Sequence, residues 1–118
     1  MNNDKPIFIM IMEMIEDDIL SGVYKTDDII ISTTQISKLL SVNPTTAVKA
    51  ISNLTDQGIL YKKRGIGMCV SDGAKEKILQ SRKEEFLSKT VPDFLKEAAK
   101  LSIPENDLIQ IIRRYNGD

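Results

Sequence analysis

The chain of 118 residues has no histidine, no tryptophan and only one cysteine, Cys69. Histidine is the commonest general acid or base and the commonest metal ligand, so its absence removes most routes to catalysis. One cysteine without histidine provides no ligand set for a transition metal. It also excludes an internal disulfide, as is typical of proteins in a reducing compartment. We therefore expect a cytoplasmic protein that is not an enzyme and has no metal and no cofactor.

Signals for a membrane or for a nucleotide are also missing. The longest apolar run, residues 7–12, is too short to cross a bilayer, and acidic residues follow it, unlike in a signal peptide. Gly65 and Gly67 are not followed by a helix that opens with Lys-Ser or Lys-Thr, which a phosphate-binding loop requires. Cys69 lies in an apolar alternation without a base to activate it, so we expect a buried structural thiol rather than a nucleophile.

Charge is balanced in total but uneven along the chain. The formal net charge is −1. Residues 13–28 contain six acids and one lysine, whereas residues 38–64 contain five basic residues and one acid, Asp56. A local basic stripe matters more for binding phosphates than the total charge does. The alternative explanation is an ordinary solvated surface.

The first third of the chain predicts one helix and one short strand. Isoleucines recur every four residues over 6–21, and Gly22 is a suitable C-terminal cap. The first two turns of this helix are apolar on almost every side, which suggests a second contact surface such as a subunit interface. The β-branched run 28–31 predicts one small strand.

Residues 32–57 predict two helices joined by a tight turn. Ser32 and Gln35 have the spacing of a capping box at the start of a helix over 32–40, with Ile36, Leu39 and Leu40 as its buried stripe. Asn43 is a suitable N-cap and Pro44 a suitable first residue for a second helix that ends before Gly58. The expected inner stripe of the second helix is Ala47, Ala50, Ile51 and Leu54, and its outward residues are Thr45, Val48, Lys49, Ser52 and Asp56.

A basic hairpin and a helical tail complete the pattern. Residues 59–71 predict two strands around a turn that contains Gly65 and Gly67, with Lys62, Lys63 and Arg64 leading into it. Residues 74–101 predict a long amphipathic helix that Pro92 should kink or interrupt, and a last helix runs from 104 to 115. The fold class is therefore mainly α with a small β-hairpin: a winged helix-turn-helix domain over 1–73 and a two-helix tail over 74–118.

This order of elements predicts DNA binding. In helix-turn-helix proteins the second helix enters the major groove with its N-terminal residues first. Thr45, Thr46 and Lys49 hold those positions here, and the free amides beside Asn43 can receive a phosphate. Arg64 at the hairpin tip can enter a narrow minor groove, where Gly65 permits a close backbone approach.

The stretch from Pro6 to Val70 resembles the DNA-binding domain of GntR-type bacterial regulators. The matching segments are PIF…DDILSG (6–22), ISTTQIS (31–37), SVNPTT (41–46), DQGILYKKRGIG (56–67) and MCV (68–70). The short tail is similar to that of the YtrA-type branch, whose members are small homodimers often linked to the repression of transporter operons. The resemblance therefore implies a homodimeric repressor that binds an inverted-repeat operator in double-stranded DNA.

Two positions depart from the family pattern. Many members carry arginine at the position of Thr34, and many carry another one turn into the recognition helix, where this chain has Val48 followed by Lys49. Arginine is the usual reader of guanine, whereas Thr45, Thr46 and Val48 can contact thymine methyl groups. We therefore expect an operator rich in A·T pairs. The residues expected to contact DNA are Ser32, Thr33, Thr34, Asn43, Thr45, Thr46, Val48, Lys49, Lys63, Arg64 and Gly65.

The tail has two possible roles. Its apolar residues could cover the core of their own chain, or they could meet a second copy across a two-fold axis. Two helices alone can hardly bury so many apolar side chains, so we favour a homodimer. The expected interface residues are Phe86, Leu87, Val91, Phe94, Leu95, Leu108 and Ile112.

Two further points stay open at this stage. A winged helix can also serve as a protein–protein interaction module without specific DNA binding, since fold does not determine function. A drug-sized ligand needs a cavity of roughly 300 Å³ or more, and a two-helix tail offers little concave volume unless two subunits form it together. The sequence itself identifies no operator sequence, no regulated genes and no small-molecule effector.

Overall fold

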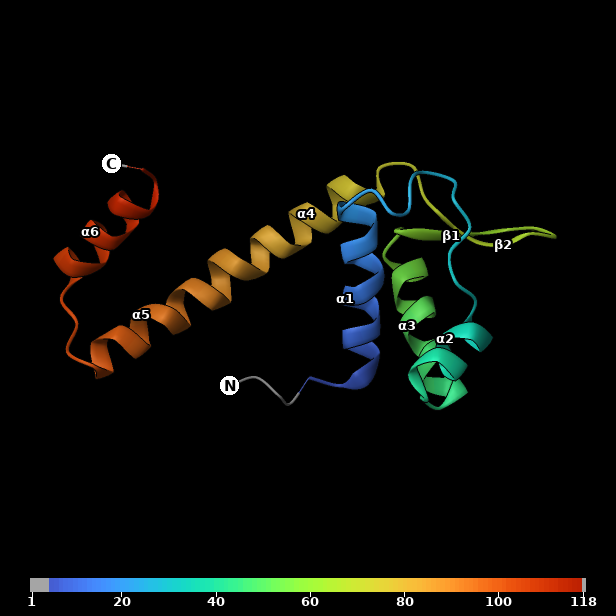
Figure 1. Ribbon diagram of the computed structural model, residues 1–118, viewed down its shortest axis with the longest axis horizontal. Coiled ribbons are helices and arrows are strands. Elements are labelled where there is room, and N and C mark those ends of the chain that lie inside the picture. Colours follow the sequence, from blue (N-terminus) through green and yellow to red (C-terminus); the bar gives the residue numbers. More distant parts are fainter. Residues whose placement is uncertain (1–4, 118) are drawn as a thin grey trace. The chain divides into compact units, whose positions relative to one another are not determined.

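The computed structural model describes residues 5–117 and divides into two compact units, Met1–Gln80 and Ser81–Asp118 (Figure 1). The first unit contains α1 (Ile7–Leu20), α2 (Thr33–Leu40), α3 (Pro44–Asp56), β1 (Leu60–Lys63), β2 (Gly67–Val70) and the start of α4 (Ala74–Glu85). The second contains the end of α4, a π-helical segment η1 (Phe86–Thr90), α5 (Val91–Lys100) and α6 (Glu105–Tyr115). The predicted fold class, mainly helical with one antiparallel hairpin, is confirmed.

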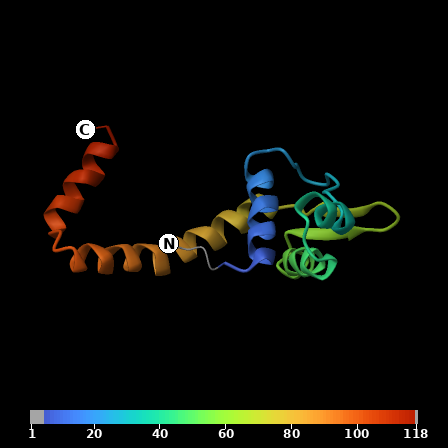
Figure 2. The same ribbon diagram turned by 60° about the horizontal axis from the view of Figure 1, so that its bottom comes forward.

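The first unit is built around one apolar core. Helix α1 buries one stripe, Ile11, Met12, Ile15 and Ile19, and it ends where Gly22 takes a φ of +88°. The inner stripe predicted for α3 is buried in full, at 6% exposure or less. Helices α2 and α3 lie beside each other in two views, and the hairpin extends beyond them (Figures 1 and 2). This core holds the surface of α3 in a fixed place.

The start of α4 belongs to the first unit. Ala74 and Ile78 are buried at 2% and 0% exposure in the same core cluster as α1 and α3. Lys77, between them, donates a hydrogen bond from Nζ to the carbonyl oxygen of Gly58 at 3.2 Å. The compact units therefore divide at 80/81, later than the expected boundary at 73/74, because the first turns of the helix pack on the core.

The strand predicted over 28–31 is wrong as a regular strand. Only an isolated bridge forms, between Ile29 and Cys69. The amide of Ile30 donates to the carbonyl of Met68, and the amide of Val70 to that of Asp28, so the segment runs briefly beside β2. Pairing ends there because the capping box at Ser32 turns the chain into α2. Cys69 is fully buried at this point, as its apolar alternation predicted.

The buried stripe predicted for α2 is correct at only one position. Ile36 is fully buried, but Leu39 is 69% exposed and Leu40 is 37% exposed. The helix has eight residues and ends at Leu40, and the chain then turns at Ser41 in a left-handed conformation with φ 54°. Its last turn therefore projects past the core instead of packing on it.

In the second unit, the predicted interruption at Pro92 takes an unexpected form. Proline has no N–H, so it removes one hydrogen bond from a helix. The chain compensates one residue earlier with a π turn, in which the amide of Val91 donates to the carbonyl of Phe86, and Pro92 then lies in the first turn of α5. Single π turns of this kind occur inside α-helices and are one of the recognised sites of a helix kink. The last helix begins and ends within one residue of its prediction.

The described part of the chain contains no helix that is both long and apolar enough to span a lipid bilayer.

Candidate nucleic-acid interface

The start of α3 is held by a side-chain cap. Asn43 Oδ1 accepts a hydrogen bond from the amide of Thr45 at 3.0 Å and another from the Thr45 hydroxyl at 2.8 Å. Pro44 fills the first helical position, where its missing N–H leaves no gap in the hydrogen bonding. The predicted start of the second helix is therefore confirmed, and its first turn faces outward with a defined geometry.

The turn before α3 is equally constrained. The Ser37 hydroxyl donates to the carbonyl oxygen of Val42 at 2.7 Å, and the amide of Val42 donates back to the carbonyl of Ser37 at 3.1 Å. Val42 itself packs against the core. These contacts fix α3 relative to α2 as one helix-turn-helix unit.

The outward face of α3 has the residues that the sequence predicted. Thr45, Val48, Lys49, Ser52 and Asp56 are all exposed, and Val48 is 49% exposed. An apolar side chain such as this valine is not stabilised by contact with water, but it can pack against a thymine methyl group. This face combines hydrogen-bonding groups, an apolar contact and one cation, which suits the edge of a DNA groove.

The start of α2 lies on the same helix-turn-helix unit. The amide of Gln35 donates to Ser32 Oγ at 3.1 Å, and the amide of Ser32 donates to Gln35 Oε1 at 2.9 Å, so the predicted capping box is confirmed. Thr33 is partly exposed and Thr34 is exposed beside it. The Ser32 hydroxyl oxygen accepts the hydrogen bond of the cap. Its own O–H is still available as a donor to an external acceptor.

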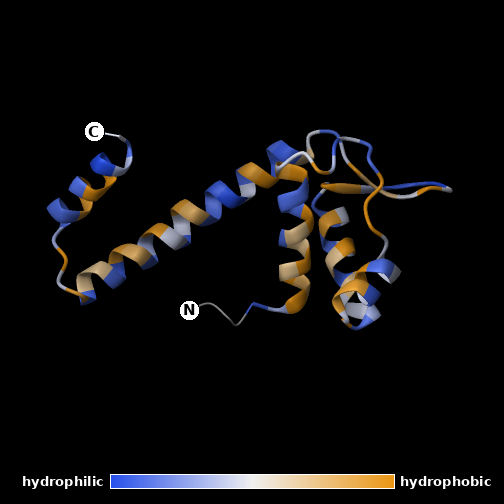
Figure 3. Cartoon of the chain, in the orientation of Figure 1, coloured by the Kyte–Doolittle hydropathy of each residue, from blue (hydrophilic) through white to orange (hydrophobic). Residues whose placement is uncertain are grey.

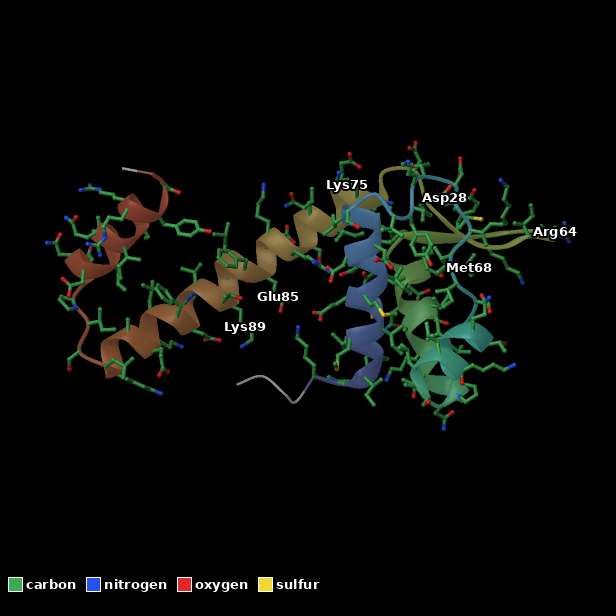
Figure 4. The ribbon with its side chains drawn as sticks, in the orientation of Figure 1. Asp28, Arg64, Met68, Lys75, Glu85 and Lys89 are labelled. Carbon is green, nitrogen blue, oxygen red and sulfur yellow. The ribbon has the colours of Figure 1, made fainter. Side chains whose placement is uncertain are left out.

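The hairpin carries its cations to its tip. The amide of Ile66 donates to the carbonyl of Lys63 at 2.9 Å and closes the turn, in which Gly65 has a φ of +77°. A residue with a side chain rarely adopts that conformation, so glycine is required there. Arg64 lies at the far end of the hairpin (Figure 4). Lys63 and Arg64 are exposed, as a contact with DNA requires.

A side-chain contact that the sequence did not predict fixes the base of the hairpin. The hydroxyl of Tyr61 in β1 donates to Asp27 Oδ1 at 2.7 Å. This hydrogen bond is the main reason why the pKa of Tyr61 rises from 10.0 to about 12. Asp27 has a φ of 70°, and its amide donates to the carbonyl of Val70. The two residues are 34 positions apart, and this spacing does not predict their contact.

A second missed contact joins α1 to the outward face of α3. The ammonium group of Lys49 lies over the ring of Phe8, at 4.2 Å from its centroid. The sequence marked both helices as neighbours of the core but gave no signal for this pair.

All the residues expected to contact DNA thus lie in the first unit, on the starts of α2 and α3 and at the hairpin tip. All seven residues expected to form a subunit interface lie in the second unit, on η1, α5 and α6. The structure therefore separates the two predicted sites into different units.

The second unit has an apolar groove between its helices. Its volume is about 510 Å³, larger than the sequence led us to expect of a two-helix tail. Six of the seven predicted interface residues line it, all except Leu87. Apolar and polar positions alternate along these helices (Figure 3), and Phe86, Phe94 and Leu95 are each at least 50% exposed.

Three helices around a core, a capped second helix and a basic hairpin define a winged helix-turn-helix protein. The family model described as "Bacterial regulatory proteins, gntR family" matches residues 9–70. The chain therefore belongs to the GntR family, which is a family of transcriptional regulators rather than of enzymes.

Known relatives support this assignment. The transcriptional repressor YtrA of Bacillus subtilis is 29% identical over 77 residues, which cover 65% of this chain and 59% of YtrA. A GntR-family regulator from Listeria monocytogenes has a similar structure, with a TM-score of 0.71, 25% identity, and coverage of 97% of this chain and 98% of that chain. The DNA-binding domain of AraR, solved in complex with operator ORR3, has a TM-score of 0.53 and 30% identity over 56% of this chain and 80% of that chain.

The resemblance to YtrA-type regulators predicted from the sequence is thereby confirmed. The matched region spans 59% of the length of YtrA and smaller shares of the other curated relatives.

Proposed function

We propose that the protein is a cytoplasmic, homodimeric transcriptional repressor that binds an inverted-repeat operator in double-stranded DNA. The observation that carries this proposal is the outward face of α3, where exposed Thr45, Val48 and Lys49 follow a fixed, capped first turn. The exposed cations of the hairpin tip supply a second contact with the DNA backbone or the minor groove. The AraR relative, solved with its operator, supports DNA rather than protein as the partner.

The direct test is selection of duplexes from a random pool, followed by fluorescence anisotropy at several salt concentrations. We expect an A·T-rich inverted repeat, because no arginine lies on the outward face of α3. Affinity should fall steeply as salt rises, in proportion to the number of phosphates contacted. Recovery of G·C-rich half-sites would contradict the proposed reading of bases. Binding that does not depend on salt or sequence would favour the protein-interaction alternative.

Arg64→Ala tests the hairpin. Loss of one phosphate or minor-groove contact should weaken binding and reduce the slope of log affinity against log salt by about 1. Lys100→Ala is the matched control, because it removes one exposed positive charge from α5 in the second unit. Equal effects of the two substitutions would mean that Arg64 contributes only to the general charge.

The dimer is proposed from the second unit. A second copy is the occupant that best fits its groove, because a two-fold axis would bury the exposed apolar residues of both chains at once. Apolar patches of this kind on an otherwise polar surface mark interaction sites. Two copies would also present two recognition helices to the two halves of an inverted repeat.

The regulated genes are proposed from the similarity to YtrA. We infer that the repressor controls a transporter operon. A search for an inverted repeat upstream of a neighbouring transporter gene would test this inference. Footprinting should then place the selected sequence over that promoter. An operator found only beside genes unrelated to transport would contradict this part of the proposal and leave DNA binding intact.

A further inference from the structure

Lys49 of α3 and Phe8 of α1 are in contact through a cation–π interaction. The Nζ atom of Lys49 lies 4.2 Å from the centroid of the Phe8 ring. Phe8 belongs to the first turn of α1 and is partly buried against the core, so its position is fixed by packing. Lys49 is exposed on α3 and would otherwise sample many rotamers.

The chemistry of this contact leaves the lysine available to a ligand. The face of an aromatic ring attracts an ammonium group. The ring occupies one side of the group, while an ammonium has three N–H donors that point in different directions. The remaining donors of Lys49 therefore stay free to meet oxygen atoms on the solvent side.

The contact also sets the direction in which Lys49 points. One turn further along α3, on the same side, Asn53 Nδ2 lies 3.9 Å from Met12 Sδ of α1. Lys49 is therefore drawn toward the edge of α3 that packs on α1. At 100° per residue, Val48 and Ser52 lie on the other side of the outward face.

We propose that Phe8 is a positioning residue that holds the Lys49 ammonium at the α1 edge of the recognition helix as a contact for a DNA phosphate. The reading of bases is then left to Thr45, Val48 and Ser52. This inference rests on the proposed DNA binding and gives Lys49 a single role there. Phosphate contacts set the register of a protein on the duplex but carry no sequence information.

The first test compares Lys49→Ala with the wild type on the selected operator and on a scrambled duplex. A phosphate contact predicts the same fold loss of affinity on both duplexes and a salt slope that is smaller by about 1. A loss confined to the operator would make Lys49 a base reader and would overturn the proposal.

The second test examines the ring. Phe8→Leu keeps an apolar side chain but removes the ring, and we expect about a two- to fivefold loss of affinity on both duplexes. Phe8→Tyr keeps the ring and should bind like the wild type. Phe8→Met repeats the test with another apolar side chain, and Met10→Leu, on an exposed residue of the same helix, is the matched control. Thermal unfolding of each variant separates a loss of binding from a loss of folding.

A double-mutant cycle makes the result decisive. If Phe8 acts through Lys49, adding Phe8→Leu to Lys49→Ala should cause no further loss of affinity. Additive losses, or tighter binding by Phe8→Leu, would overturn the proposal, because the ring would then be independent of Lys49 or would compete with DNA for it. If the wild type prefers no duplex at all, the proposed function fails. If the wild type binds DNA but the two residues are uncoupled, only this inference fails.

Discussion

The two units of this chain differ in how many apolar side chains they bury. The first buries a cluster of fifteen apolar residues from α1, the segment before α2, α2, α3, the hairpin with the residue before it, and the start of α4. Within residues 81–117, Ala98 is the only residue that the structure shows as buried. The first unit therefore has a core of its own, whereas the second has an amphipathic surface without one. This contrast is the physical basis for proposing that the first unit is stable by itself and that the second has a partner.

The largest expected effect lies in the core of the first unit. Leu54 is fully buried in α3, so Leu54→Ala should lower the free energy of unfolding by about 2–5 kcal/mol through lost contacts and a cavity. Urea unfolding followed by circular dichroism measures this change. The matched control is Leu101→Ala, at a residue that is 62% exposed. Equal losses from the two substitutions would remove the contrast between the units.

The second prediction concerns the apolar groove. Phe94 is 52% exposed and lines it, so Phe94→Ala should weaken the proposed dimer by about 2 kcal/mol or more if the ring is a central interface residue. Sedimentation equilibrium gives the dissociation constant directly. The core of the first unit does not include Phe94, so the substitution should leave the folding of that unit unchanged.

Lys96→Ala is the control for that experiment, because Lys96 is an exposed residue of α5 that does not line the groove. A wild-type protein that sediments as a monomer would contradict the dimer itself. A dimer that Phe94→Ala leaves intact would move the interface elsewhere, for example to the apolar first turns of α1.

Much of the first unit was predictable from the sequence because local signals agree with the global fold there. Asn43 and Pro44 mark a helix start, Gly58 and Gly65 adopt the left-handed conformations that favour glycine, and the 3.6-residue period identifies the inner face of α3. The same local logic failed for Leu39, because burial depends on which other elements cover a helix end, and periodicity does not contain that information.

The parts of the candidate site that were missed are contacts between distant segments. Phe8 and Lys49 come from different helices, and Tyr61 and Asp27 are 34 positions apart. Each pair forms because the core brings two elements together, so only the folded structure reveals it.

The π turn before Pro92 was missed for another reason. Proline predicts the loss of a hydrogen bond, but not which local geometry replaces it.

The third prediction compares the helix starts of the two units. The start of α3 has a side-chain cap, whereas α6 begins after Pro104 without one. Asn43→Ala should therefore destabilise the first unit by about 1 kcal/mol, and Asn43→Asp should restore the cap. Pro104→Ala is the matched substitution and should change stability less. Urea unfolding checks both, and an undiminished stability of Asn43→Ala would mean that packing alone fixes the start of α3.

The smallest expected effect concerns the hydrogen bond that anchors the hairpin. Folding raises the pKa of Tyr61 from 10.0 to about 12, because its hydroxyl donates to the carboxylate of Asp27. The bond favours the protonated tyrosine, so its contribution to stability is fully present below pH 10 and is lost as the pH rises through about 12.

Titration of tyrosinate by ultraviolet absorbance should show a component with this late midpoint in the wild type and none in Tyr61→Phe. Asp27→Asn should shift the component to lower pH, since it removes the negative charge that opposes ionisation. If the late component survives in Tyr61→Phe, it belongs to another tyrosine. The proposed effect of the Tyr61–Asp27 hydrogen bond on the hairpin would then be contradicted.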